Sequence, residues 1–195
     1  CPEDFPEHWY GALDRVRAAV GETYSVHGEV RSPLDHLFAL LGMQDGLMAM
    51  LTEADRLRAL MRTFCDMSAA WAVAQVRRGC DAIKLSSPYA GAGFISRDQY
   101  REWVLPFEAP IADAVRSEGG LLYTHTCGAI GDRLDLMAEA GVHGIESLDP
   151  PPLGTVELAE AKRKLRDRLF IKGNVDSVHT LRRDDAASVR AEVER

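Results

Sequence analysis

The sequence lacks several features that would assign it to a common functional class. It has no apolar run near the roughly 20 residues that a membrane-spanning helix needs, and no secretory signal. It has neither a G-x-G-x-x-G motif nor a Walker loop, so no motif predicts nucleotide binding. Its 23 Lys and Arg residues are outnumbered by 30 Asp and Glu, which gives a formal net charge of −7. This acidic balance argues against nucleic acid or an anionic membrane as a partner.

Cysteine is scarce, and its placement matches no disulfide framework. The four cysteines are Cys1, Cys65, Cys80 and Cys127. Scattered cysteines of this kind favour a reducing compartment, so we expect a cytoplasmic protein. Cys65 falls within a helical pattern and Cys80 at the start of a strand, where both are typical of inert core residues.

The remaining composition is that of a soluble globular chain. Hydrophobic residues make up 46% and charged residues 27% of the 195 positions, enough for one domain with a sizeable core. From about residue 79 onward, strand and helix patterns alternate, which predicts an α/β fold of parallel strands joined by crossover helices. The expected strands span residues 24–30, 81–86, 121–127, 142–147 and 168–172.

Helical periodicity and capping signals fill the intervals between these strands. Capping signals are expected at Thr52, Ser96 and Thr155, and Gly79 is expected to end the long helix. Pro106 and Pro110 should kink or break the helix that contains them. The expected helices span residues 1–20, 34–41, 52–78, 96–118, 129–140, 155–165 and 185–194.

The most informative stretch is GLLYTHTCG, residues 120–128. His125 and Cys127 lie two residues apart at the end of a strand, so their side chains point the same way, and Gly128 lets the backbone turn. A neutral imidazole and a thiolate suit Zn²⁺. A buried cysteine next to a structurally bonded histidine would show the same spacing.

Polar residues also follow the other strands. Ser87, Glu146 and the pair Asn174 and Asp176 each come at or just after a strand end. In a parallel fold these ends meet at one face, so we expect Ser87, His125, Glu146 and Asn174 to converge there. The alternatives are structural. Ser87 can belong to a turn, Glu146 can pair with a lysine, and Asn174 and Asp176 can form Asx turns or helix caps.

Five segments of the chain together resemble a known family. They are GCDAIKLSSPYAG (79–91), FISRDQYREWVLP (94–106), GGLLYTHTCG (119–128), AGVHGIESLDP (140–150) and LFIKGNVDSVHTL (169–181). In order and spacing they resemble the uroporphyrinogen decarboxylase superfamily, which also contains zinc-dependent methyltransferases that move methyl groups between corrinoid proteins and thiols such as coenzyme M. The resemblance implies a (β/α)8 TIM barrel. Because about five strands are visible, we expect an incomplete barrel: one domain over residues 1–195, truncated at both ends.

The resemblance also implies a chemistry for the His-x-Cys pair. The methyltransferase branch carries this pair, binds zinc through it, and has a further cysteine much later in the chain. Decarboxylases of the superfamily lack the pair and use no metal. His125 and Cys127 therefore favour a zinc-dependent methyltransferase with a corrinoid as methyl carrier. No cysteine follows Cys127, so the zinc site is expected to be incomplete in this chain.

Further roles follow from the same resemblance. Glu146 is expected to be a third ligand or a base that orients His125. Ser87 and Asn174 are expected to be catalytic, and Tyr89 and Asp176 to bind substrate. The expected partners are a small thiol or a tetrapyrrole, a corrinoid protein, and a second copy of the chain. The alternatives are a metal-free uroporphyrinogen decarboxylase and a non-catalytic barrel fragment.

Overall fold

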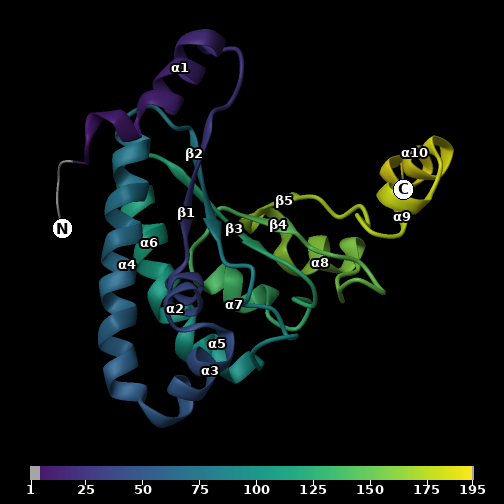
Figure 1. Ribbon diagram of the computed structural model, residues 1–195. Coiled ribbons are helices and arrows are strands. Elements are labelled where there is room, and N and C mark those ends of the chain that lie inside the picture. The colour runs from purple at the N-terminus through teal and green to yellow at the C-terminus, as the bar shows by residue number, and fades with distance from the viewer. Residues whose placement is uncertain (1–4, 195) are drawn as a thin grey trace.

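The computed structural model describes residues 5–194 and confirms the expected α/β fold with parallel strands. The five strands form one sheet in the order β1-β2-β3-β4-β5, and every neighbouring pair is parallel (Figure 1). Sequential order with helical connections is the arrangement found in part of a (β/α) barrel. The strands are β1 (His27–Arg31), β2 (Ala82–Ser86), β3 (Leu121–Thr126), β4 (Gly144–Ser147) and β5 (Phe170–Lys172).

Helices connect the strands and cover one face of the sheet. The long helix α4 packs against β1 and β2, and α6 packs against β3. The described helices are α1 (Gly11–Val20), α2 (Pro33–Leu41), α3 (Met43–Thr52), α4 (Ala54–Arg77), α5 (Arg97–Trp103), α6 (Leu105–Ser117), α7 (Leu134–Glu139), α8 (Leu158–Leu165), α9 (Thr180–Arg183) and α10 (Ala186–Glu194), with short 3-10 turns η1 (Glu7–Trp9) and η2 (Arg166–Arg168). None of these helices is both long and apolar enough to span a membrane.

Two of the three expected capping signals are wrong. Thr52 belongs to the end of α3, and α4 starts after Glu53, whose side chain makes no capping bond. Thr155 lies three residues before α8, and its hydroxyl accepts a hydrogen bond from the Gly131 N–H. The capping box at Ser96 is confirmed, because the Ser96 and Gln99 side chains each accept from the other residue's backbone N–H.

Other element boundaries differ from the expected ones for local reasons. The first helix begins at Gly11 after the turn η1, and residues 1–4 of the expected helix lie outside the described residues. The helix expected over 129–140 begins only at Leu134. The expected break is present near Pro106: α5 ends at Trp103, and Pro106 occupies the first turn of α6, where its missing N–H costs nothing. Pro110 lies inside α6 and does not end it.

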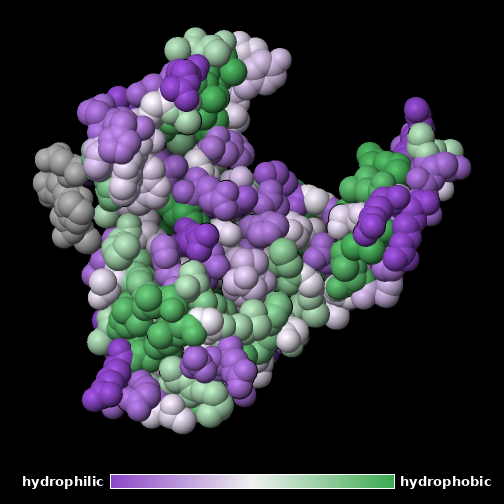
Figure 2. Space-filling model, in the orientation of Figure 1, coloured by the Kyte–Doolittle hydropathy of each residue, from purple (hydrophilic) through white to green (hydrophobic). Residues whose placement is uncertain are grey.

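The two faces of the sheet have different chemistry. Ile83, Leu85, Leu122 and Ile145 are fully buried against the helices. The opposite face carries polar side chains, which occupy the middle of Figure 2 where Figure 1 shows the strands. One register row of this face crosses all five strands and consists of Arg31, Ser86, His125, Glu146 and Lys172.

The edge of the sheet at β1 is closed by side chains of α4. The Gln75 amide accepts from the Glu29 N–H at 3.3 Å and donates to the Glu29 carbonyl at 3.2 Å. The Ser68 hydroxyl donates to the Arg31 carbonyl at 2.8 Å. Ser68 and Gln75 are themselves buried, so these polar groups satisfy one another away from water.

The last two helices lie apart from the sheet. In Figure 1, α9 and α10 project from the body beyond β5, and neither helix contains a buried residue. Asp176 begins this segment by accepting hydrogen bonds from the N–H groups of Val178 and His179, both at 2.8 Å. Asp185 accepts from the Ser188 N–H at 2.9 Å at the start of α10.

The confirmed capping box gives a direct test of the fold. Replacing Ser96 with Ala removes the acceptor for the Gln99 N–H, and we expect the free energy of unfolding to fall by about 1 kcal/mol. Urea denaturation followed by circular dichroism measures this change. Ser117→Ala serves as the control, because the Ser117 hydroxyl bonds only within the last turn of α6. Equal losses in the two variants would contradict the assignment of Ser96 as a cap.

Candidate functional site

The centre of the candidate site is the end of β3. His125 is the second-last residue of β3, Cys127 follows the strand, and Gly128 turns the chain away with φ +74°. The Cys127 Sγ lies 3.3 Å from the His125 Nε2. The sequence-based expectation that both side chains point to one side of the strand is met by this distance.

Neighbouring strands orient the imidazole of His125. Its Nδ1 lies 2.9 Å from Glu146 Oε2 and 3.2 Å from the Ser147 hydroxyl, both on β4. A proton on Nδ1 donates to the Glu146 carboxylate, which leaves the lone pair of Nε2 facing Cys127. The other oxygen of Glu146 lies 2.5 Å from the Lys172 ammonium of β5. Lys172 also lies over the ring of Tyr123, 4.9 Å from its centre.

The surrounding charges set the protonation of these groups. Burial raises the pKa of Glu146, but the Lys172 ammonium and then His125 outweigh it, so the net pKa lies below the usual carboxyl value. Burial, followed by the Asp149 and Glu146 carboxylates, raises the pKa of the Cys127 thiol. Glu146 is therefore an anion at neutral pH and Cys127 is a neutral thiol, which must lose its proton to bind a metal ion.

The donor pair matches part of a zinc site. Nitrogen and sulfur atoms on one tetrahedral zinc ion lie about 3.5 Å apart, given bonds of about 2.0 and 2.3 Å, and the separation here is 3.3 Å. Within residues 5–194, no three His, Cys, Asp or Glu side chains are grouped so that they could hold a metal ion. The described chain thus supplies two donors, with Glu146 bonded behind His125.

Glycines let the adjoining loops pack tightly around the end of β3. A Cβ on Gly91 would lie 2.7 Å from the Cys127 carbonyl oxygen. A Cβ on Gly154 would lie 2.3 Å from the Asp149 carbonyl oxygen and 2.6 Å from that of Gly128. The Asp149 carboxylate also accepts from the Gly128 N–H at 2.7 Å. These contacts hold the turn after Cys127 from both sides.

A buried arginine fixes the loop that follows β2. Arg133 is fully buried, and its guanidinium donates to the carbonyls of Ala90 at 2.8 Å and Ile95 at 3.1 Å. The same group lies over the ring of Tyr100, 5.7 Å from its centre. This loop includes Gly91, so Arg133 stabilises one wall of the candidate site.

Ser87 does not join His125, contrary to the sequence-based expectation. It follows β2 as expected, but its side chain points to the helix-covered face, where it is 1% exposed and its hydroxyl lies 2.6 Å from Glu108 Oε1. The physical reason is the alternation of side chains along a strand. The preceding residue, Ser86, is the one that pairs with His125 in register.

The other predicted residues make structural contacts. The Asn174 amide donates to the Leu148 carbonyl at 3.0 Å, so it ties the loop after β5 to the end of β4. Tyr89 is half-buried between the rings of Phe38 and Phe94. Asp176 forms an Asx turn before α9, which is one of the alternatives that the sequence left open, and its carboxylate also contacts the His179 ring at 2.8 Å.

Cys65 and Cys80, which were expected to be inert, lie in structural positions away from the end of β3, and so does His143. Cys65 and Cys80 are buried, and burial raises the pKa of each thiol to about 11. His143 precedes β4, and its Nδ1 accepts from the Leu122 N–H at 3.1 Å, at the start of β3. These three residues lie at the opposite end of the strands or within a helix.

Sequence reasoning missed several residues around His125. Lys172 could have been found by the strand-end argument that found Glu146, because it is the last residue of β5 and pairs with Glu146 in register. Ser147 has φ +84°, a conformation that is strained for a residue with a side chain, and no sequence pattern indicates it. Glu108 comes from a helix and therefore gave no strand-end signal.

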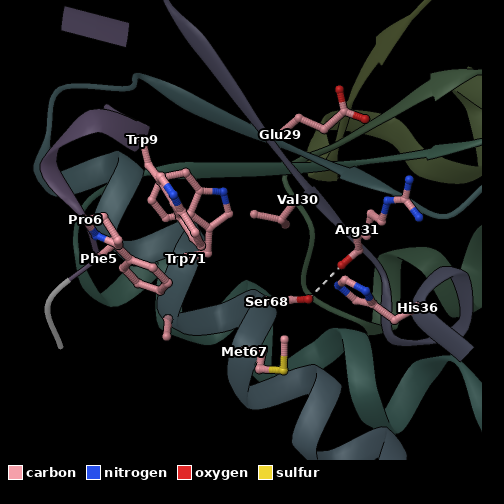
Figure 3. Close-up of a pocket in the computed structure, with 11 residues that line it drawn as sticks. Phe5, Pro6, Trp9, Glu29, Val30, Arg31, His36, Met67, Ser68 and Trp71 are labelled. Atoms are coloured by element: carbon pink, nitrogen blue, oxygen red, sulfur yellow. Dashed lines mark hydrogen bonds between the residues drawn. The ribbon is translucent and has the colours of Figure 1, made fainter. Parts of the chain in front are cut away.

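A separate hollow lies along the edge of β1. It has a volume of about 840 Å³ and is lined mainly by apolar side chains. Figure 3 shows Trp9 and Trp71 on one side and His36 on the other, with the Ser68–Arg31 hydrogen bond between them. This hollow is bounded by η1, β1, α2 and α4, so none of the His125 cluster lines it.

Comparisons with known proteins identify relatives of the whole chain. A family model described as uroporphyrinogen decarboxylase (URO-D) matches residues 2–195. A uroporphyrinogen decarboxylase from Gloeobacter violaceus is 29% identical over 194 residues, covering 93% of this chain and 52% of that protein. A methylcobamide:CoM methyltransferase, MtaA, from Methanosarcina barkeri is 24% identical over 181 residues, covering 93% and 51%.

A solved structure shares the fold. A methyltransferase from Methanosarcina mazei superposes with a TM-score of 0.84 at 23% sequence identity, covering 94% of this chain and 52% of that one. At this identity the match establishes the fold. The chain spans about half the length of the relatives that it matches.

The buried Glu108 generates a pH prediction. Burial raises its pKa to about 7, against which the Ser87 hydrogen bond acts only in part. Between about pH 4.3, the usual carboxyl value, and about pH 7, the folded chain keeps a proton that the unfolded chain has lost. The stability due to this proton is present in full below that range and is lost as the pH rises through it.

We expect Glu108→Gln to flatten this dependence. The difference in slope between the two proteins should reach about one proton, because glutamine does not ionise. Denaturant titrations at several pH values measure it. The same slope in both proteins would show that Glu108 does not hold a proton in the folded state.

Proposed function

Because the chain belongs to the uroporphyrinogen decarboxylase family, we propose that it provides part of the active site of a zinc-dependent methyltransferase that moves a methyl group between a corrinoid and a thiol. The observation that carries the proposal is the contact of 3.3 Å between His125 Nε2 and Cys127 Sγ. The similarity to a methylcobamide:CoM methyltransferase over 93% of the chain supports it.

His125 and Cys127 are the residues that would hold the zinc ion. When bound, zinc supplies the charge that lowers the pKa of a thiol substrate, so that the substrate is a nucleophilic thiolate at neutral pH. Remaining positions of a four-coordinate site belong to the substrate and to donors outside the described residues. Glu146 is a further carboxylate beside the pair, in contact with the other ring nitrogen of His125.

The chain's own residues prepare this donor pair. Glu146 accepts the Nδ1 proton of His125 and thereby selects the tautomer of the neutral ring whose lone pair is on Nε2. Lys172 holds Glu146 in its ionised form, so the carboxylate remains an acceptor. Cys127 would have to lose its proton to bind a metal ion, and its exposed position would let solvent accept that proton.

The loops after the strands shape the rest of the site. Tyr89 and Asn174 stand in the loops that follow β2 and β5, where the contacts described above hold them in place. We assign them to substrate positioning, and Asp176 to holding the start of α9. Ser86, rather than Ser87, is the serine of β2 that faces a substrate beside His125.

The proposed partners follow from this chemistry. They are a small thiol as methyl acceptor and a corrinoid protein as donor, in the cytoplasm. Because the chain spans about half the length of its relatives, we infer that the functional unit includes further polypeptide, from a longer chain or from a second copy.

Decarboxylation of a tetrapyrrole is the second candidate. The observation in its favour is the 29% identity to a uroporphyrinogen decarboxylase over 93% of the chain, which is higher than the identity to the methyltransferase MtaA. In this case His125 and Glu146 would act on the substrate as a hydrogen-bonded acid and base, with no metal. A non-catalytic barrel fragment is the third candidate.

Metal binding separates the first two candidates. We expect the chain to bind one zinc ion weakly, because residues 5–194 supply two donors, and Cys127→Ser to lower the affinity at least about tenfold. Competition with a chromogenic zinc indicator measures the affinity in a Cys1→Ser background. Circular dichroism should show the same secondary structure in each protein.

Cys80→Ser and His143→Ala are the matched controls. Each removes the same type of donor away from the end of β3, so zinc affinity should not change. Equal zinc affinity in the chain and in Cys127→Ser would reject the zinc proposal. Release of CO₂ from a uroporphyrinogen by the metal-free protein would support the decarboxylase instead.

A further inference from the structure

A second cluster of polar groups lies directly behind the candidate site. Glu108 of α6 is 1% exposed, and its Oε1 accepts the hydroxyl proton of Ser87 at 2.6 Å. Its other oxygen, Oε2, is buried and has no hydrogen-bond partner among the described residues. A carboxyl group in such a place requires either a proton or a further donor, because an unpaired buried anion is very costly.

The same buried layer holds two unsatisfied hydroxyls on β3. Thr124 and Thr126 are 1% and 0% exposed, and the Oγ1 atom of each lacks a partner within the described chain. The Ser87 N–H donates to the His125 carbonyl at 2.9 Å, which places Ser87 beside Thr126, one residue beyond the last pair of the β2–β3 ladder. Thr126 is therefore the neighbour of Ser87 on the face covered by α6.

Thr126 occupies the position between the two candidate ligands. Side chains alternate along β3, so His125 and Cys127 point to the polar face while Thr126 points to α6. Any contact that fixes the Thr126 hydroxyl also fixes the backbone on which His125 and Cys127 stand. Buried polar atoms without protein partners in such layers are generally joined by an internal water molecule with two to four polar neighbours.

We propose that Glu108 is a positioning residue for the segment 125–127, which it holds through Ser87 and through a buried water shared with the Thr126 hydroxyl. In this arrangement, Glu108 is a neutral carboxylic acid. Its Oε1 accepts from Ser87, and the proton on Oε2 is donated to the water, which in turn donates to Thr126. The link joins α6 to the ends of β2 and β3.

The groups that face Glu108 are compatible with a neutral acid. On its own side of the sheet the titratable neighbour is Tyr100 of α5, whose pKa is raised by burial and then by the Glu108 carboxyl. The cation beside Tyr100 is the Arg133 guanidinium, which is already bonded to two carbonyls and to Asp132. No cation bonds to Glu108 among the residues that the structure describes.

The test follows the Cys127 thiol and needs no metal, so it is independent of the proposed zinc chemistry. In a Cys1→Ser background, Cys127 is the exposed cysteine, while Cys65 and Cys80 are buried. The rate of alkylation of Cys127 by iodoacetamide, measured over a range of pH, reports both the exposure and the pKa of the thiol. Zinc affinity by indicator competition is the second readout.

The variants distinguish loss of the proposed link between Glu108 and Thr126 from a general loss of stability. We expect Glu108→Leu and Thr126→Val each to raise the alkylation rate about threefold, and the double variant to add nothing further, because both remove the same link. Glu108→Gln keeps the shape of the side chain and a hydrogen-bond donor, so Cys127 in this variant should be alkylated at the wild-type rate. Glu118→Leu, at the residue that follows the same helix and pairs with Arg77 on the surface, is the matched control and should have no effect.

If Glu108→Leu does not fold, the Cys127 alkylation rates of Ser87→Ala and Thr126→Val provide the test instead. Additive effects of Glu108→Leu and Thr126→Val, or an unchanged alkylation profile in both, would overturn the proposal. Loss of zinc affinity of about tenfold in Thr126→Val, together with the altered thiol rate, would support both proposals. If the variants change the alkylation rate of Cys127 but the chain binds no zinc, the positioning role of Glu108 is supported and only the zinc proposal is rejected.

Discussion

Hydrogen bonding between parallel strands decides which side chains stand next to one another at the candidate site. The register of β3, β4 and β5 sets His125, Glu146 and Lys172 side by side. Since every second residue of a strand points to the same face, all three side chains meet on the polar side of the sheet. The tautomer of His125, the charge of Glu146 and the position of Cys127 depend on this row. A slip of one residue in any of these strands would place the corresponding side chain among the helices.

The same alternation explains how far sequence reasoning could reach. The alternation of strands and helices, and the placement of His125 and Cys127 on one side of a strand, follow from local patterns, because each depends on a few neighbouring residues. The choice between Ser86 and Ser87 depends on where β2 pairs with β3, and a difference of one position reverses the answer. Glu108 reaches the site from α6 through tertiary packing, which no local pattern encodes. The signals at Thr52 and Thr155 failed because neighbouring elements, and not the hydroxyl groups, decide where α4 and α8 begin.

The candidate site has two layers with opposite electrostatics. On the open side, Glu146 is paired with Lys172 and His125, so charge is abundant and balanced. On the helix side, Glu108 lies among Ser87, Tyr100 and buried apolar residues, where an anion is disfavoured. The end of β3 separates the two layers. A methyltransferase and a decarboxylase would use the open layer differently, whereas the buried layer would serve either one by holding the strand in place.

The bonds that Gln75 and Ser68 make to β1 have a consequence for assembly. A sheet with a free edge is a template on which strands of other molecules can pair, which leads to aggregation. At β1, an incoming strand would have to displace the Gln75 amide from both backbone groups of Glu29 before it could bond there. At the other edge, β5 is only three residues long, so it offers little backbone to pair with. The five-stranded sheet is thereby protected at both margins from uncontrolled growth, even though its strands do not close into a ring.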